Sequence, residues 1–161
     1  DQLTTWCAQH DTITFEPRPA RSYELVSLSG SESVSIVRFL MEIEQPNQVI
    51  IAAIESAITW FKEVKLTGIK LVRIADQSRS NGFDRIVIED HQAAPMWARF
   101  YNIKTNQPIY CSRDGIIRNT LSEISHERRT GYSWLGRYAQ KLLSEDFPAW
   151  QSRLEKMNNS K

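Results

Sequence analysis

The sequence has 161 residues and a formal net charge of +1 at pH 7, with 41% hydrophobic and 24% charged residues. These fractions are typical of a folded domain and exclude a disordered chain. The small net charge gives no support to nucleic-acid binding, and no apolar run reaches the roughly 20 residues that span a membrane.

The chain begins with a polar stretch, residues 1–28, that two prolines interrupt. Proline has no backbone N–H and breaks regular elements, so we expect an extended arm that is ordered by packing. Ser29, followed three places later by Glu32, forms a capping-box pattern, and apolar residues then recur at helical spacing. This pattern predicts a first helix that ends before Pro46.

A second helix is predicted directly after this break. Asn47 can cap it, and Gly68 can end it. Its apolar residues, which cover a wide face, are Val49, Ile50, Ala53, Ile54, Ala57, Ile58, Phe61 and Val64. A stripe this broad indicates burial on more than one side. Two helices joined so closely are typical of an α/α toroid or a helical bundle, so we expect a mainly α fold.

The hydrophobic period changes from helical to alternating at Ile69. Residues 69–74 alternate in the manner of a strand, and residues 86–88 form a second short apolar run. Residues 78–82 have the composition of a loop between them. We therefore expect a small sheet beside the helices.

Two further strands are predicted on either side of a turn. Residues 97–103 alternate in the period of a strand, and residues 109–113 follow a proline that is tolerable at a strand start. If the turn centres on Asn106, Arg99 lies opposite Arg113 on one face. Like charges opposed in this way are destabilising, so the pair makes best sense with an anion between its members. Guanidinium groups suit carboxylates and phosphates.

The register of this hairpin is open. A loop of two or four residues would place Arg113 on the opposite face from Arg99 and leave both as ordinary surface residues. On spacing alone we favour this second interpretation, because most arginines on strands are solvated.

Three short helices are predicted in the last third of the chain, which is expected to fray at its end. The helices cover residues 121–126, 137–144 and 149–157, and the fraying residues are 158–161. The two cysteines, Cys7 and Cys111, could pair or could remain buried thiols, and we favour thiols.

Two patterns that superficially match metal sites lack ligands. His126 opens a stretch that is similar to a zinc-protease helix, but Thr130 stands where the second histidine is required. Glu89 and Asp90 supply two carboxylates, whereas calcium takes about six to eight oxygen ligands. We therefore predict no metal site at these residues.

Several motifs in the sequence are specific enough to indicate a family. They are WCAQHD at 6–11, PARSYELVSLSGSES at 19–33, KLTGIKLVR at 65–73, WARFY at 97–101, SRDG at 112–115 and LSEISHERRTGYSWLG at 121–136. Together they resemble the carboxyl-terminal part of the family 10 polysaccharide lyases, which are pectate lyases. The resemblance covers nearly the whole chain.

The resemblance implies roles for individual residues. Arg113 falls where the family has its proton-abstracting arginine, and Arg99 where it has an arginine that binds a substrate carboxylate. Arg21 is a weaker match to another substrate-binding arginine. Tyr132 is our candidate for a further residue of the cleft. The family often has tyrosine at the position of Leu135, which puts a sugar contact from that position in doubt.

The tryptophans are ambiguous between core and cleft. Trp6, Trp60 and Trp150 have apolar neighbours and are most simply core residues. Trp97 and Trp134 flank the arginine region and could stack on sugar rings, although we favour the core for Trp97.

The reaction that the resemblance implies is cleavage of polygalacturonate by β-elimination. Arg113 abstracts the proton at C5, next to the uronate carboxylate, and the sugar at C4 is expelled. Calcium and cationic side chains on the carboxylate stabilise the charge that develops. Arginine is normally protonated, so we expect activity to rise toward alkaline pH.

The same resemblance implies that residues 1–161 are the carboxyl-terminal half of one catalytic module of a secreted enzyme. The chain begins at Asp1 without an initiator methionine, and it lacks the acidic motifs that supply the family's main calcium ligands. We expect Ca²⁺ ligands to lie mainly in the missing amino-terminal half and the lone chain to be inactive. Two alternatives are a non-catalytic module that binds acidic carbohydrate and a helical interaction domain without sugar specificity.

Overall fold

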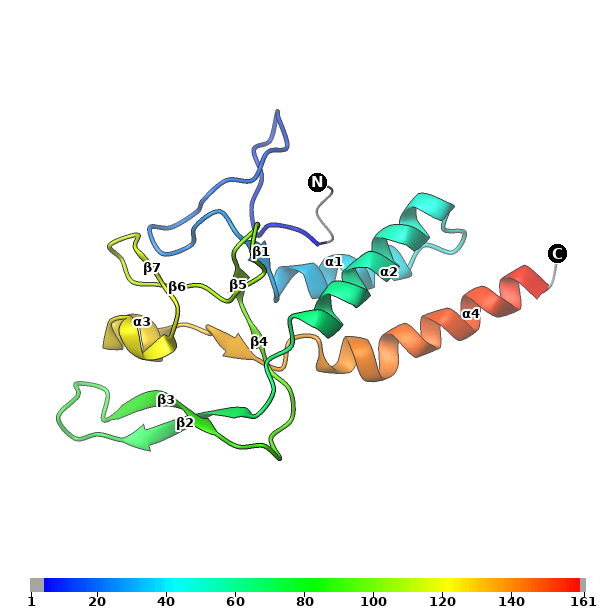
Figure 1. The fold of residues 1–161 in the computed structure, drawn as a ribbon. Helices are drawn as coiled ribbons and strands as arrows, with labels where there is room; N and C mark the ends of the chain where they lie inside the picture. The colour runs from blue at the N-terminus through cyan, green and yellow to red at the C-terminus, as the bar shows by residue number, and fades with distance from the viewer. Residues whose placement is uncertain (1–4, 160–161) are drawn as a thin grey trace.

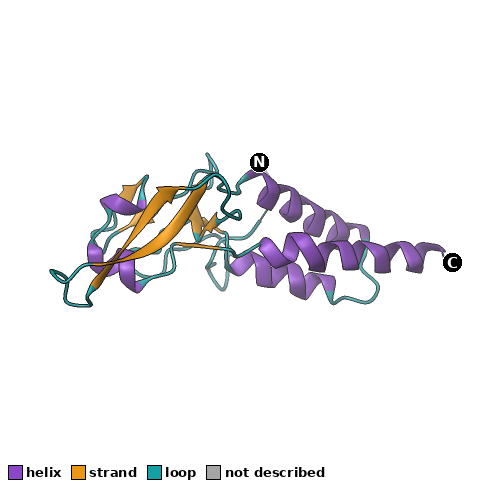
Figure 2. Cartoon of the chain, turned by 90° about the horizontal axis from the view of Figure 1, so that it is seen from below, coloured by secondary structure: helices purple, strands orange, loops and turns teal. Residues whose placement is uncertain are grey.

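The long helices and the strands occupy opposite ends of the molecule. The structure is a computed structural model that describes residues 5–159. Figure 1 and Figure 2 show α1 (Glu32–Met41), α2 (Gln48–Glu63) and α4 (Phe147–Asn159) together at one end and the strands at the other. Among the described residues, no helix is both long enough and apolar enough to cross a membrane.

The two helices predicted near the start of the chain are confirmed. The Asn47 side chain caps α2 by accepting a hydrogen bond from the N–H of Ile50 at 3.0 Å. The Ser29 hydroxyl accepts from the N–H of Glu32 at 2.9 Å, as the capping pattern predicts, although Ser31 holds the N-cap position of α1. The residues that both helices bury include Val34, Val37, Ile54, Ile58 and Phe61.

The two helices predicted at the end of the chain are one continuous segment. The π-helical turn η2 (Leu142–Asp146) runs directly into α4. Pro148 follows this π-helical turn within the continuous segment, and it has no N–H to donate to the carbonyls of that turn. Residues 158 and 159 continue α4, and the rest of the tail that we expected to fray lies outside the described residues.

The helix predicted at 121–126 is short and is followed by another. Residues Leu121–Glu123 form the 3₁₀ helix η1, in which the Glu123 carboxylate accepts from the N–H of Thr120 at 2.8 Å. The chain then enters α3 (His126–Gly131). An ion pair fixes α3 to the strands, because Arg129 donates from Nε and Nη2 to Asp84 at 2.8 and 2.6 Å.

Within the part of the chain that the structure describes, the strands form four two-stranded antiparallel sheets. The pairs are β1 (Leu28–Ser29) with β5 (Phe100–Tyr101), β2 (Ile69–Ala75) with β3 (Phe83–Glu89), β4 (Trp97–Ala98) with β8 (Leu135–Gly136), and β6 (Tyr110–Cys111) with β7 (Ile117–Arg118). The β2–β3 pair confirms the predicted small sheet. The fold is thus mixed: the predicted helices and small antiparallel sheet are present, but helices dominate less than the prediction of a mainly α chain implied.

The hairpin predicted across residues 97–113 does not form in the expected register. Tyr101 forms a bridge with Pro108, whereas a turn centred on Asn106 would place Cys111 opposite Tyr101. The strand predicted at 97–103 is divided into β4 and β5, each of which pairs with a distant segment.

Backbone contacts with those distant segments explain the difference. The N–H of Arg99 donates to the Trp134 carbonyl at 2.7 Å, and the Arg99 carbonyl accepts from the N–H of Gly30 at 2.8 Å. Both hydrogen-bonding groups of Arg99 are therefore occupied, and Arg113 cannot pair across from it. The approach requires glycine at position 30, because a Cβ there would lie 2.1 Å from the Ala98 carbonyl oxygen.

The core contains most of the tryptophans, and the cysteines are buried free thiols, as predicted. Trp60, Trp97, Trp134 and Trp150 are buried, and Trp6 is partly buried against the same core. Trp97 and Trp134 therefore cannot line an open cleft. Leu135 is also buried, at 5% exposure, so it offers no surface to a sugar.

Candidate functional site

Four arginines meet around two tyrosine rings. Tyr23 and Tyr132 lie edge to face, with 5.3 Å between their ring centroids. The guanidinium carbons of Arg21, Arg113 and Arg128 lie 5.3, 5.7 and 4.5 Å from the centre of the Tyr23 ring. Those of Arg21 and Arg99 lie 5.7 and 5.0 Å from the centre of the Tyr132 ring. We call these six residues the arginine–tyrosine cluster.

Segments far apart in the sequence supply this cluster. Arg21 and Tyr23 belong to the arm, Arg99 lies between β4 and β5, Arg113 follows β6, and Arg128 and Tyr132 lie in and just after α3. The turn after Arg113 rests on the arm, because a Cβ at Gly115 would lie 3.6 Å from the carbonyl oxygen of Ser22. The arm and the β6–β7 sheet are thus held side by side at the cluster.

Each arginine of the cluster is paired with a carboxylate. Arg21 donates from Nε and Nη2 to Glu24 at 2.8 and 2.7 Å. Arg113 uses the same two nitrogens to reach Glu127, at 3.3 and 3.0 Å. Arg128 binds Glu127 as well, from Nε at 2.6 Å and also from Nη2. The fourth pair joins Arg99 to Glu32, the first residue of α1.

These contacts keep the carboxylates of Glu24 and Glu127 ionised. Burial alone would raise the pKa of Glu24, but hydrogen bonds from Arg21 and Tyr132 outweigh it and hold that pKa below its usual value. Hydrogen bonds from Arg128 and then Arg113 lower the pKa of Glu127 to about 2. Both groups are therefore anions at neutral pH and can only accept hydrogen bonds.

Some guanidinium nitrogens keep N–H groups for a ligand. No described residue accepts a hydrogen bond from Nη1 of Arg21 or of Arg113. The Nε atom of Arg99 is buried and has no hydrogen-bond partner among the described residues. An unpaired buried donor is costly, so a site with such a group is suited to an incoming acceptor.

Three of the four predicted site residues line one pocket. This pocket, of about 260 Å³, has Arg21, Arg99 and Tyr132 in its wall, together with Glu24 and Glu32. Arg113 does not line it and lies on the Tyr23 side of the cluster, with a side chain that is 63% exposed. Arg99 and Arg113 therefore share a cluster, but they contact different tyrosine rings and only Arg99 lines the pocket.

Sequence reasoning missed the carboxylates of this site. Glu24 follows Arg21 by three residues, and that spacing is the local signal that could have indicated the pair. Glu32 was assigned only to helix capping, because its contact with Arg99 spans 67 residues of chain. Glu127, the carboxylate that Arg113 and Arg128 share, was also not assigned to this site from the sequence, and the Arg128 side chain that it pairs with is buried.

The described residues do not by themselves fit a calcium ion. No three side chains of histidine, cysteine, aspartate or glutamate gather there in the manner of a metal site. The cluster's carboxylates already accept hydrogen bonds from arginines. Calcium takes about six to eight oxygen ligands, far more than these groups could offer.

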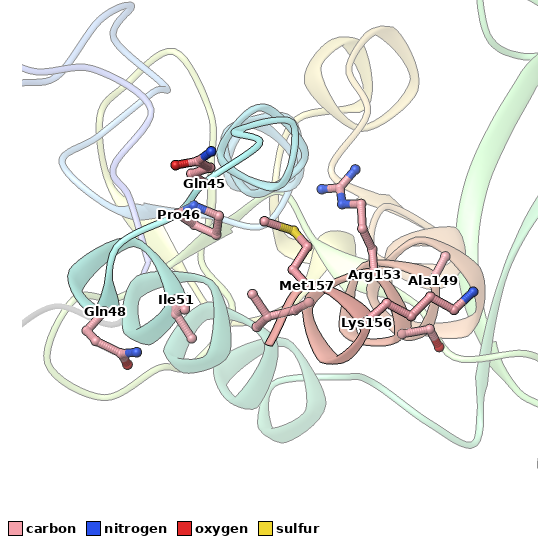
Figure 3. Close-up of a pocket in the computed structure, with 10 residues that line it drawn as sticks. Gln45, Pro46, Gln48, Ile51, Ala149, Arg153, Lys156 and Met157 are labelled. Carbon is pink, nitrogen blue, oxygen red and sulfur yellow. The ribbon is translucent and has the colours of Figure 1, made fainter. Parts of the chain in front are cut away.

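A larger pocket lies at the helical end of the molecule. It has a volume of about 820 Å³ and lies between the start of α2 and the last turns of α4 (Figure 3). Its wall includes Pro46, Ile51, Leu154 and Met157. None of the predicted site residues lines it, so the smaller arginine pocket is the candidate site.

Comparisons with protein families and with solved structures both find similarity to polysaccharide lyases. A family profile described as pectic acid lyase matches residues 1–143. No curated protein gives a match.

Two solved structures of a family 10 polysaccharide lyase from Cellvibrio cellulosa are similar to this chain. One, an aspartate-to-alanine mutant in complex with trigalacturonic acid, has 37% sequence identity and a TM-score of 0.72 over 86% of this chain and 42% of its own. The other also has 37% identity, with a TM-score of 0.71 over 86% of this chain and 41% of its own. The chain thus spans less than half the length of these relatives.

Proposed function

Because this chain belongs to the pectic acid lyase family, we propose that it carries the uronate-binding part of an enzyme that cleaves pectate. The observation that supports this most directly is the pocket shared by Arg21, Arg99 and Tyr132. Guanidinium groups bind carboxylates with two parallel hydrogen bonds, and each unit of polygalacturonate carries one carboxylate. The similar Cellvibrio lyase was solved with trigalacturonic acid, which is a short piece of that polymer.

The proposed reaction is β-elimination. The C5–H bond breaks and its proton passes to Arg113, the electrons of that bond form the C4–C5 double bond, and the C4–O bond breaks. The oxygen of the departing sugar takes up a proton from water. Arg113 must be neutral to accept the proton, and the neutral fraction of a guanidine grows as pH rises. Arg21 and Arg99 would bind the uronate carboxylate and stabilise the negative charge that develops next to C5.

Calcium is part of the proposal but is not assigned to these residues. Bound to a uronate carboxylate, the ion would add positive charge where the carbanion forms. Because the described side chains do not fit a calcium site, we propose that its ligands lie mainly in an amino-terminal half of the module.

We further propose that residues 1–161 are the carboxyl-terminal half of one catalytic module that closes as an α/α toroid in a secreted enzyme. Supporting this, the chain covers 42% of a similar lyase chain. Phe39 on α1 and Val49 on α2 are 66% and 76% exposed, so the helical end presents apolar side chains that a further layer of helices could cover.

The proposal can be tested with the chain mixed with an amino-terminal half of a family 10 module. Adding polygalacturonate and Ca²⁺ should produce the ultraviolet absorbance of unsaturated uronides, rising toward alkaline pH. The Arg113→Ala variant should lower kcat by about 10²- to 10⁴-fold, as removal of a general base does. Arg21→Ala and Arg99→Ala should chiefly raise KM.

The control is Arg79→Ala, which removes an exposed arginine of the β2–β3 loop that pairs with Asp76. Its kcat should equal that of the unmodified protein. Product formation that persists in Arg113→Ala would remove this residue as the base. A larger loss of kcat in Arg21→Ala than in Arg113→Ala would indicate that the base is Arg21, a residue of the pocket, and not Arg113.

A second candidate function is a non-catalytic module that binds acidic carbohydrate. It is favoured by the position of Arg113, which lies outside the pocket and is already bound to Glu127. This alternative predicts that the chain binds oligogalacturonate and that the mixture produces no unsaturated uronide.

A further inference from the structure

Glu24 is a buried carboxylate that the function proposed above does not use. Its side chain is 11% exposed. It accepts hydrogen bonds from Nε and Nη2 of Arg21 and from the hydroxyl of Tyr132, at 2.8, 2.7 and 2.5 Å. A single carboxylate therefore joins an arginine of the arm to the tyrosine that follows α3.

In the hydrogen bond between Glu24 and Tyr132, the tyrosine hydroxyl is the donor. An ionised carboxylate has no proton to give, so the hydroxyl proton of Tyr132 must be the one that is shared. Burial, and then this hydrogen bond to Glu24, raise the pKa of Tyr132, so the phenol keeps its proton. A tyrosine hydroxyl has only one proton, and once it is committed the oxygen can only accept further hydrogen bonds.

The pocket thus holds two kinds of polar group next to each other. The guanidinium carbons of Arg99 and Arg21 lie 5.0 and 5.7 Å from the centre of the Tyr132 ring, and these groups can only donate. The Tyr132 oxygen beside them can only accept. At about 260 Å³ the pocket is slightly below the roughly 300 to 1,000 Å³ of drug-sized ligand sites, which suits one sugar unit.

We infer that Glu24 turns Tyr132 into a hydrogen-bond acceptor, so that the pocket selects a uronate that has a free hydroxyl near its carboxylate. The carboxylate faces the arginines, and the hydroxyl donates to Tyr132. A uronate whose hydroxyl carries an acetyl group has no proton to donate there. It would leave the Tyr132 oxygen unpaired and bring an ester oxygen toward it, which lowers affinity.

The inference rests on the proposed function, because it assumes that the pocket binds a uronate. Its test compares trigalacturonate with the same trimer acetylated on its secondary hydroxyls, using isothermal titration calorimetry on the full chain. The unmodified chain should bind the free trimer at least about tenfold more tightly, since an unpaired buried acceptor has a cost of that order. Binding of neither trimer would overturn both this inference and the proposed function.

Two variants separate the Tyr132 contact from general binding. Tyr132→Phe removes the acceptor, so the free trimer should bind more weakly and the preference should fall below about twofold. Glu24→Leu removes the acceptor of the Tyr132 proton, which can then turn toward a ligand, and the preference should fall in the same way. Equal binding of both trimers by the unmodified chain, or a preference that survives in Tyr132→Phe, would overturn this inference and leave the proposed function standing.

A matched control and a measurement without ligand complete the design. Asp146→Asn breaks a different ion pair, with Arg38 at 2.7 Å, and should keep the preference. In Glu24→Leu the Tyr132 phenol should ionise at lower pH than in the unmodified chain, as followed by tyrosinate absorbance. An unchanged titration would show that Glu24 does not hold the hydroxyl proton and would overturn the inference.

Discussion

Arg99 is held from three directions, so its side chain enters the pocket in a fixed orientation. Its backbone N–H and carbonyl are bonded to Trp134 and Gly30, and its guanidinium is bound to Glu32. Glu32 is itself fixed, because its N–H donates to the Ser29 hydroxyl. A group that is already ordered loses little entropy when it binds, which favours affinity for a carboxylate.

At this scale the motifs identified the arginines but not their partners. Arg21, Arg99 and Tyr132, which the sequence predicts as site residues, line one pocket, and their roles stay predictions. The contact of Glu32 with Arg99, and that of Tyr132 with Glu24, join residues far apart in the chain. Such contacts depend on tertiary packing, to which local spacing gives no access.

The first prediction concerns Gly30. The Gly30→Ala substitution should destabilise the fold by about 2 kcal/mol or more, because the new Cβ would meet the Ala98 carbonyl oxygen at 2.1 Å and the backbone must shift. Chemical unfolding measures the change. Gly131→Ala is the matched control, since its Cβ would meet only Arg128 Nη2 at 3.6 Å, and its stability should change little. Equal stability of the two variants would contradict this account.

At the scale of elements, α3 is the part that connects the sheets to the site. Arg129 ties it to β3, Arg128 lies against Tyr23, and Tyr132 leaves its end toward the pocket. Both members of the Arg129–Asp84 pair have side chains that are 11% exposed. A shift of α3 would therefore move Arg128, Arg129 and Tyr132 together, and with them the polar contacts that each residue makes.

Hydrophobic periodicity predicted α1, α2 and the β2–β3 hairpin well. These elements are long and regular, so their patterns are visible in the sequence. The two-residue strands are different, because each exists only where a distant segment pairs with it. The hairpin predicted about Asn106 failed for this reason, and a mainly α fold class followed from the same omission.

The second prediction follows from the low pKa of Asp84. Hydrogen bonds from Arg129 lower that pKa from 3.8 to about 2. The folded state therefore binds this proton less readily than the unfolded state, and the resulting stability is present above pH 4 and is lost as pH falls toward 2. The loss should be roughly 2 kcal/mol.

The measurement compares the free energy of unfolding of the unmodified chain and Asp84→Asn between pH 6 and pH 2. Asp84→Asn should be less stable at pH 6, and the difference should shrink as the pH falls. Asp114→Asn serves as the control: it removes another carboxylate with a pKa of about 2, but one whose side chain is 41% exposed, so the effect should be smaller. A difference for Asp84→Asn that is constant with pH would contradict the assignment.

At the scale of the whole molecule, the strand end carries the polar site and the helical end carries exposed apolar side chains. Figure 1 shows α4 extending away from the strands beside α1 and α2. Motif resemblance predicted the family of the chain, which the family match confirms. That the chain is half of a module stays a proposal, since a pattern within one segment does not show what packs against it.

The third prediction concerns this helical end. At high concentration the isolated chain should self-associate through it, because apolar side chains gain free energy when they leave water. The double variant Phe39→Ser with Val49→Ser should reduce association with little change in stability, as measured by sedimentation equilibrium. Ile13→Ser with Phe15→Ser is the control, since these residues are 85% and 75% exposed but lie on the arm. Association that only the arm variant reduces would contradict the prediction.

The pairing of every cluster arginine with a carboxylate also affects how the molecule meets other polyanions. Three carboxylates balance most of the charge of the four guanidinium groups, with Glu127 shared by Arg113 and Arg128, so the cluster projects only a weak electric field into the solvent. The cluster would therefore attract sulfated or phosphorylated polymers only weakly at long range. Discrimination among acidic polymers must then arise at short range, from how well a sugar fits between the built-in anions.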